Sequence, residues 1–173
     1  MVLPVVILLG ALIDDPLRAS ETPTTPMFER YSDGARQAIV SALTVAQRLG
    51  ADSIDTDHLF VGAIATRSID IQAIARLHGL DLESAVQEIK GNGDQARPPA
   101  IVDVPLTSVA IRILEHAEEE ARLLDDRLIG PEHLFLAIIR GGGGIAGTVL
   151  KAHGVTIESA REELRTRRTQ TGQ

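Results

Sequence analysis

Cysteine and tryptophan are both absent from this chain of 173 residues, and aromatic residues make up only 2% of it. The lack of cysteine excludes disulfides, thiolate metal sites and a cysteine nucleophile, and it is compatible with a reducing cytoplasm, where we expect the protein to reside. With so few aromatic side chains, the core must be built from Ala, Leu, Ile and Val, which suits closely packed helices better than a sheet. We therefore predict an all-α fold.

Basic residues are scarce as well. The chain has 17 Lys and Arg against 24 Asp and Glu, which gives a net charge of −7. A nucleic-acid partner would require a concentrated Lys/Arg surface, so we expect no nucleic-acid partner. The one basic cluster consists of Arg161, Arg165, Arg167 and Arg168. We interpret it as a solvated helix face whose charge is favourable near a helix C-terminus.

The first 26 residues differ from the rest of the chain. Residues 1 to 13 are apolar, but no positive charge precedes them, and a membrane-spanning helix needs about 20 apolar residues. Asp14 and Asp15 interrupt the apolar run, and a stretch rich in Pro and Thr, with the composition of a linker, follows. We expect residues 1 to 26 to be disordered or not part of the native protein, and we expect no membrane association.

The rest of the chain contains one unit twice. Residues 28 to 89 align without a gap onto residues 103 to 164 at a constant offset of 75, with 15 identities in 62 pairs. A unit of this size is marginal by itself, because a small domain buries a small fraction of its surface. We therefore predict that the two copies pack about a pseudo-twofold axis as one domain over residues 27 to 165. A linker at 91 to 102 joins the repeats, and residues 166 to 173 form a tail.

Each repeat shows the apolar periodicity and end signals of four helices. Ser32 can cap the first helix of repeat one, and its partner in repeat two runs from Thr107. The second helices, which start near His58 and His133, are apolar nearly all round, as central, buried helices are. The expected second, third and fourth helices begin near residues 56, 69 and 82 and again near 131, 145 and 157, and the last ends near 167. The architecture is thus predicted to be an eight-helix, pseudo-twofold domain.

The pairs Asp57-His58 and Glu132-His133 look most like a site. A metalloprotease helix, however, carries two histidines four residues apart with a catalytic Glu between them, and each helix here has a single one. We interpret the acid as a helix initiator and the histidine as packed against a neighbouring turn. A metal-dependent hydrolase that uses His58 and His133 is kept only as a remote alternative.

Other chemical signatures are missing. Residues 141 to 144 are four glycines without the Gly-Lys-Ser/Thr ending of a phosphate-binding loop, so we expect a flexible interhelical loop. His78 and His153 precede helix-ending glycines and are expected to bond terminal carbonyls. No nucleophile elbow or ATPase signature is present. Composition and spacing indicate a non-catalytic helical binding module with no cofactor, whose second-helix termini offer N–H groups and a carboxylate to a ligand.

Three segments carry a resemblance to a known family. Met27-Phe-Glu-Arg-Tyr-Ser-Asp-Gly-Ala-Arg36 resembles the opening of the Clp amino-terminal repeat domain of ClpC-type unfoldases, which begins Met-Phe-Glu-Arg-Phe-Thr. Ile54-Asp-Thr-Asp-His-Leu-Phe-Val-Gly-Ala-Ile64 and Ile129-Gly-Pro-Glu-His-Leu-Phe-Leu-Ala-Ile-Ile139 are similar to the family signature Ile-Gly-Thr-Glu-His-Leu/Ile-Leu-Leu-Gly-Leu-Ile. The resemblance covers residues 27 to 165, and the chain resembles a free-standing Clp N-domain.

The resemblance implies an eight-helix module that is normally fused to ATPase rings feeding the ClpP protease, and that receives adaptors and substrates. For this chain it implies a non-catalytic protein- or peptide-binding module: an adaptor, modulator or decoy whose partners are Clp ATPase or protease subunits, adaptors or substrate proteins. The alternative is a sequestering protein for cyclic peptide antibiotics or for proteins marked by phosphoarginine.

The resemblance also implies site residues. Carried over from the family, the phosphoarginine pockets pair Asp57 with Ser32 and Glu132 with Thr107, the carboxylate taking the guanidinium and the hydroxyl taking the phosphoryl group. Phe28 and Arg36 match family positions near a surface that binds cyclic peptides.

The sequence departs from the family pattern at these sites. Asp57 is one methylene shorter than the expected Glu, and Pro131 replaces the Thr before Glu132. The second repeat reads Leu106-Thr-Ser-Val-Ala-Ile111, which lacks the family's aromatic and both of its basic residues. These departures favour general peptide or Clp-partner binding over phosphoarginine recognition.

Overall fold

The computed structural model describes residues 29 to 91 and 104 to 171. The expectations for residues 1 to 26, for Phe28 and for nearly all of the linker at 91 to 102 lie outside the described residues. Within them, the only β-type pairings are two isolated bridges, and the all-α prediction is confirmed.

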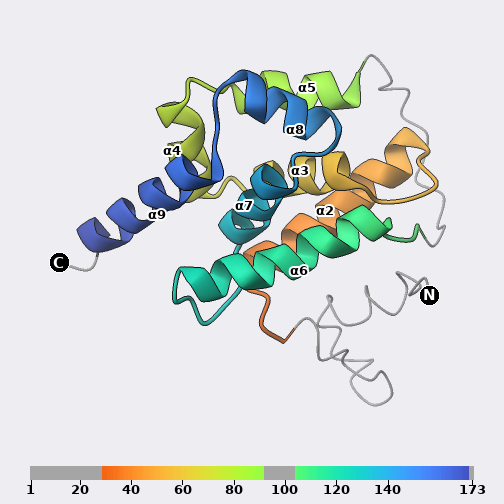
Figure 1. Cartoon of the computed structure of the whole chain (residues 1–173). Coiled ribbons are helices and arrows are strands. Elements are labelled where there is room, and N and C mark those ends of the chain that lie inside the picture. Colours follow the sequence, from red (N-terminus) through yellow and green to blue (C-terminus); the bar gives the residue numbers. More distant parts are fainter. Residues whose placement is uncertain (1–28, 92–103, 172–173) are drawn as a thin grey trace.

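Each repeat contributes four helices to the fold (Figure 1). Those of the first repeat are α2 (Asp33–Leu49), α3 (Thr56–Ala65), α4 (Ile69–Leu77) and α5 (Leu82–Lys90). Those of the second are α6 (Ser108–Leu123), α7 (Pro131–Gly141), α8 (Gly144–Ala152) and α9 (Ile157–Thr171).

The first helices begin where the sequence predicts. The Ser32 hydroxyl accepts a hydrogen bond from the backbone N–H of Ala35 at 3.2 Å, and the Thr107 hydroxyl accepts one from Ala110 at 3.1 Å. Both side chains satisfy donors that have no partner inside the helix. At the other end of α2, Gly50 takes the left-handed conformation, with φ of 68°, that ends many helices.

The two repeats exchange their extended segments. The backbone N–H of Ser32 donates to the carbonyl of Ile129 at 2.9 Å, and the N–H of Thr107 donates to the carbonyl of Ile54 at 2.9 Å. The two bonds are equivalent under the 75-residue offset, so each repeat contributes the same strand-like segment to the other. These two equivalent backbone hydrogen bonds follow the predicted pseudo-twofold symmetry.

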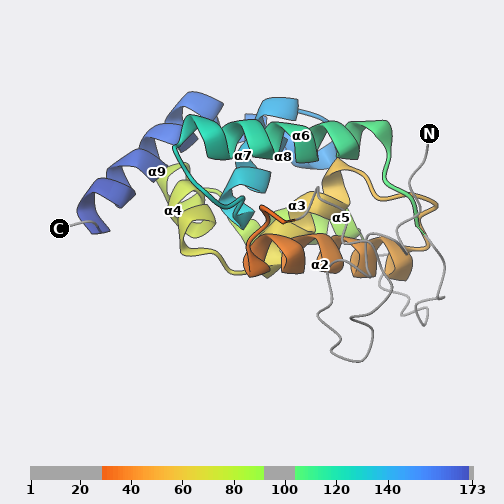
Figure 2. The same cartoon turned by 90° about the horizontal axis from the view of Figure 1, so that it is seen from below.

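Helices α3 and α7 lie against each other at the centre, between α2 and α6 (Figure 2). Further out, α4 packs on α9 and α5 packs on α8, so the third helix of each repeat contacts the fourth helix of the other. The core is therefore shared, as expected for one eight-helix domain. Its largest fully buried side chains come from both repeats and include Phe60, Ile74, Ile113 and Phe135.

The histidines near the ends of α4 and α8 play different parts. His153 Nδ1 lies 2.9 Å from the carbonyl oxygen of Val149, which is the terminal-carbonyl contact expected from the sequence. His78 Nε2 instead lies 2.8 Å from the hydroxyl of Ser159 on α9. The third helix of repeat one is thus tied by a polar contact to the fourth helix of repeat two.

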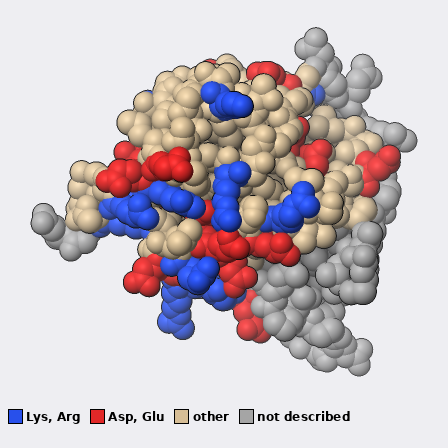
Figure 3. Space-filling model, viewed as in Figure 1, with Lys and Arg blue, Asp and Glu red and all other residues tan. Residues whose placement is uncertain are grey.

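Charged side chains of both signs alternate over α6, α7 and α9, whereas the part of the same face over α5 and α8 carries few charges (Figure 3). Repeat two also contains a charge cluster around a buried carboxylate. Glu120 is fully buried and accepts two hydrogen bonds from Arg161, at 2.8 and 2.7 Å, and one from Arg140 at 3.4 Å. The interpretation of Arg161 as part of a solvated face was wrong, because its guanidinium neutralises a buried carboxylate.

No single helix in the described ranges is both long and apolar enough to cross a membrane. Taken together, α7 and α8 have the length and composition of a membrane span, but they are bent by 85° at the break between them.

Candidate functional site

The start of α2 and the start of α7 meet at an open pocket of about 490 Å³, which we call the Ser32–Glu132 pocket. Ser32 comes from the first repeat and Glu132 from the second, and the exchanged backbone segments bring them together. The lining of the pocket is completed by Asp70, Asp126, Arg127, Leu128, Gly130, Pro131 and Arg168.

This arrangement differs from the pairing that the family resemblance implied, which placed Ser32 with Asp57 and Glu132 with Thr107. Helix α2 has 17 residues, so it holds Ser32 about 25 Å from the turn that leads to Asp57. Thr107 instead lies beside Ile54, in the segment that leads to Asp57. The candidate pairs are therefore formed between repeats.

Glu132 has the carboxylate that is best placed to receive a ligand. Its side chain is 16% exposed, and its Oε1 lies 3.6 Å from Nδ1 of His133. That nitrogen already accepts a hydrogen bond from the backbone N–H of Gly130 at 2.8 Å. Among the described residues, no donor hydrogen-bonds to the Glu132 carboxylate. A half-buried carboxylate with unused lone pairs is a strong acceptor for a guanidinium or ammonium group.

His133 is held as a structural residue beneath this pocket. With Nδ1 accepting from Gly130, the proton lies on Nε2, which donates to Asp126 Oδ2 at 2.8 Å. Burial lowers the pKa of His133, against the opposing effect of the Glu132 and Asp126 carboxylates. The imidazole is therefore neutral at pH 7, with both of its nitrogens in use.

A metal ion does not fit this cluster, even though donor atoms of Asp126, Glu132 and His133 lie within 4.8 Å of one another. The lone pair of Nδ1 is taken by Gly130, and the guanidinium of Arg168 lies 2.5 Å from Asp126. These contacts remove the basis for the remote alternative of a metal-dependent hydrolase at His133.

His58 has the same role in repeat one. Its Nδ1 accepts from the backbone N–H of Asp55 at 3.2 Å, while the Asp55 carboxylate accepts from the N–H groups of Asp57 and His58. This reciprocal arrangement is a capping box in which histidine stands in place of Glu or Gln. This helix was expected to start at Thr56 without Asp55 as its cap, although an Asp three residues before the histidine is a readable signal.

Asp57 is committed to a structural contact. Its carboxylate accepts hydrogen bonds from the backbone N–H groups of Ala146 at 2.8 Å and Ile145 at 3.1 Å, and so caps the start of α8. Gly144 has φ of +70°, and a Cβ there would lie 2.4 Å from Asp57 Oδ1. Glycine at position 144 thus allows Asp57 to approach the start of α8. Asp57 and Glu132, which are equivalent under the 75-residue offset, therefore have different roles.

The other expected site residues are placed as follows. Thr107 caps α6 with its hydroxyl. Arg36 is half-buried on α2, and its Nε donates to the carbonyl of Tyr31 at 3.1 Å, which holds the segment before that helix. Phe28 lies outside the described residues.

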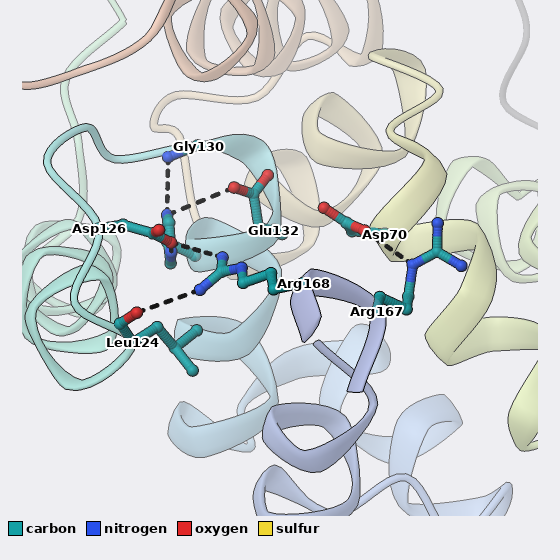
Figure 4. A network of polar contacts seen from close by, with 8 residues as sticks. Asp70, Leu124, Asp126, Gly130, Glu132, Arg167 and Arg168 are labelled. Carbon is teal, nitrogen blue, oxygen red and sulfur yellow. Dashed lines mark hydrogen bonds and ion pairs between the residues drawn. The ribbon is translucent and has the colours of Figure 1, made fainter. Parts of the chain in front are cut away.

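The end of α9 borders the Ser32–Glu132 pocket, and sequence reasoning did not anticipate this (Figure 4). Arg168 pairs with Asp126 at 2.5 Å, and Arg167 Nε donates to Asp70 at 2.9 Å. These two arginines were interpreted as a solvated face near a helix C-terminus; they are 33% and 32% exposed, Arg168 does lie in the last turn of α9, and each is also paired with a carboxylate. The helix also extends four residues beyond the expected end at Arg167, so part of the expected tail is helical and contacts both repeats.

Comparisons with known proteins identify the family of this fold. The family model described as the Clp repeat (R) N-terminal domain matches residues 30–153 and 105–171. The chloroplastic chaperone protein ClpC2 of Oryza sativa subsp. japonica is 33% identical over 152 residues, which is 85% of this chain and 16% of the relative. The ATP-dependent Clp protease ATP-binding subunit ClpA homolog of Porphyra purpurea is 33% identical over 141 residues, 80% of this chain and 17% of the relative.

Solved structures show the same fold. The N-terminal domain of the chaperone ClpD from Arabidopsis thaliana superposes with a TM-score of 0.62 at 29% identity, over 85% of this chain and 99% of that one. The Hsp104 N-terminal domain from Candida albicans gives 0.61 at 14% identity, over 78% and 89% of the two chains. The chain spans about one sixth of the length of the curated relatives described above. It belongs to the Clp repeat N-terminal domain family.

Proposed function

We propose that this protein is a non-catalytic binding module of the Clp system, acting as an adaptor, modulator or decoy that receives proteins or peptides through the Ser32–Glu132 pocket. The observation that carries the proposal is that the Glu132 carboxylate faces an open pocket and accepts no hydrogen bond from the described residues. We further propose that the binding unit spans residues 27 to 165, that it works in the cytoplasm, and that it has no enzymatic activity of its own.

The chemistry of the pocket suits a basic group on a peptide. A carboxylate and a guanidinium form two parallel hydrogen bonds, a geometry that gives specificity as well as affinity. The Ser32 hydroxyl and the Arg168 guanidinium line the same pocket and can contact polar or anionic groups next to the bound cation. The partners that fit the family are Clp ATPase or protease subunits, their adaptors and their substrates.

The test is affinity capture from the cell extract with the whole chain, with Glu132→Gln and with Asp57→Asn as matched control. The wild type and the Asp57 variant should recover Clp subunits, adaptors or substrates, whereas the Glu132 variant should lose them. Because Glu132→Gln removes charge at almost constant volume, it should fold normally, which circular dichroism checks. Equal recovery by all three proteins would place partner binding elsewhere.

A second candidate is a sequestering protein for phosphoarginine-marked proteins or cyclic peptide antibiotics. The observation in its favour is that Glu132, Ser32 and Arg168 line one pocket. Glu132 can pair with a guanidinium, while the Arg168 guanidinium and the Ser32 hydroxyl can contact the phosphoryl group attached to it. Calorimetry with free phosphoarginine should give one site per chain, because Asp57 is occupied by α8. Two equal sites, or binding that survives in Glu132→Gln, would contradict this form of the proposal.

A further inference from the structure

A second cavity opens in repeat one, where the end of α3, the α3–α4 turn and the start of α4 face α5. We call it the α3–α5 groove; its volume is about 630 Å³, and it shares no residue with the Ser32–Glu132 pocket. Its apolar lining consists of Val61, Ile64, Ala65, Ile71, Leu82 and Val86.

The same face of repeat two is covered by charges. Under the 75-residue offset, Ala65 corresponds to Arg140 and Val86 corresponds to Arg161. Both arginines contact the buried Glu120, whose counterpart in repeat one is Val45. Repeat two therefore closes this face with an internal ion-pair cluster, while repeat one leaves it apolar and open. The helices around this face are equivalent in the two repeats, so the repeats differ here in their side chains and not in their helices.

The turn at the edge of the groove holds a backbone conformation that favours glycine. Arg67 has φ of +55°, and its counterpart in repeat two is Gly142 with φ of +62°. A residue with a Cβ is disfavoured in this region, and such strain tends to persist where the side chain is used. Among the described residues, the Arg67 side chain has no hydrogen-bond or ion-pair partner. Its guanidinium is therefore available to a molecule in the groove.

The charges around the groove favour an acidic occupant. Arg67 and Lys90 line it together with the single acid Glu83, so its rim is net positive on a chain whose net charge is −7. Lys90 likewise has no side-chain partner among the described residues. A segment that places apolar side chains on the half-buried Ile64 and Val86 would thus meet two cations beside them.

We propose that the α3–α5 groove docks a short segment of a partner protein that presents apolar side chains flanked by a carboxylate. The apolar floor supplies contact area, and Arg67 and Lys90 select the charge of the segment. This docking surface is separate from the Ser32–Glu132 pocket, and the two could hold different parts of one partner or two partners.

The test uses a synthetic library of short peptides in which matched members carry the same apolar residues with either glutamate or lysine beside them. The peptides are captured on the immobilised whole chain and quantified by mass spectrometry. The double variant Val45→Glu/Val86→Arg puts the Glu120–Arg161 pair at the equivalent positions of repeat one. Val86 lines the groove and Val45 does not, so the new arginine occupies the groove while the new glutamate supplies its partner. Retention of acidic apolar peptides should fall about tenfold in this variant, the change expected when a central contact is lost.

Two single variants separate charge recognition from folding. Arg67→Gly should weaken binding of the acidic peptides about twofold to fivefold, the effect of one exposed ion pair, while leaving the unfolding temperature equal or higher. Asp125→Gly is the matched control. Like Arg67, Asp125 has a positive φ, of 59°, and corresponds to a glycine in the other repeat, Gly50. Asp125, however, lies outside the groove. It should leave peptide binding unchanged.

The outcomes decide between the proposals. Equal retention of the glutamate and lysine peptides, or undiminished retention by a folded Val45→Glu/Val86→Arg variant, would overturn the groove proposal. Failure of the immobilised chain to retain any peptide would also overturn the groove proposal. The groove would then have to be covered by another part of this chain or by a second copy of it. Glu132→Gln should keep the acidic peptides, so failure of the Ser32–Glu132 pocket is distinguishable from failure of the groove.

Discussion

The rings of Phe60 and Phe135 stack with their centroids 5.7 Å apart and their planes inclined by 26°. The two residues are equivalent under the 75-residue offset, so the pseudo-twofold axis passes between them. Both side chains are fully buried. The contact that completes the core is therefore made between the repeats, and neither repeat can form it alone.

Truncation of one ring should destabilise the whole domain. We expect Phe135→Ala to lower the free energy of unfolding by about 3–5 kcal/mol, because it removes buried apolar area and leaves a cavity at the centre. Phe135→Leu keeps most of the volume and should cost clearly less. Urea denaturation followed by circular dichroism measures both values. Equal losses for the two variants would mean that cavity formation is not the cause.

Replacing Asp57, the acid of repeat one, should lower the stability of the fold and leave ligand binding at the Ser32–Glu132 pocket unchanged. Asp57→Ala removes the side chain that caps α8, so we expect a loss of about 1 kcal/mol in the free energy of unfolding. Glu132→Ala removes no hydrogen bond within the described residues and should change stability less. Chemical denaturation and calorimetry on the same samples compare the two. A Glu132 variant that loses stability while keeping its ligand would reverse these roles.

The buried imidazole of His133 should make stability depend on pH. Because burial lowers its pKa below the ordinary 6.5, the unfolded chain binds a proton more readily than the folded one. The stabilisation is therefore fully present above pH 6.5 and is lost as the pH falls towards the folded-state pKa. The urea midpoint should decrease between about pH 7 and pH 5.

His133→Gln tests the assignment of this pH dependence. A glutamine at this position can still accept from the N–H of Gly130, as in an ordinary capping box, but it does not titrate. We expect the slope of the urea midpoint against pH to flatten in this variant. The exposed His153, changed to Gln, is the control and should leave the slope in place. A slope that is the same in the His133 variant would assign it to other groups.

The buried Glu120 should depend on its arginine. Arg161→Ala removes the guanidinium that forms two hydrogen bonds with a fully buried carboxylate and leaves it only the longer contact with Arg140, at 3.4 Å. We expect a loss of up to about 3–5 kcal/mol, the value for a buried charge that loses its partner. Glu120→Val/Arg161→Val copies Val45 and Val86 of repeat one and should recover most of that loss. Thermal and urea unfolding of the single and double variants measures the recovery. A double variant as unstable as the single one would show that the pair itself, and not the unpaired charge, matters.

Much of the fold could be predicted because its signals are local or repeated. Apolar spacing at 3.6 residues located the helices, and Ser32 and Thr107 marked helix starts that the structure confirms. The constant offset of 75 residues predicted the duplication, and the apolar sequences around His58 and His133 predicted two central helices. Each of these signals acts within a few residues, so no knowledge of the folded chain was needed.

The composition of the candidate site was decided only by the tertiary structure. The sequence paired Ser32 with Asp57, but the exchange of segments between the repeats pairs Ser32 with Glu132. Asp57 and Glu132 look alike in the aligned repeats, yet one caps α8 and the other faces a pocket. These outcomes depend on which distant backbone groups approach each carboxylate. Helical periodicity specifies the face that a residue occupies and not the element packed against it, so only the folded chain could separate the two acids.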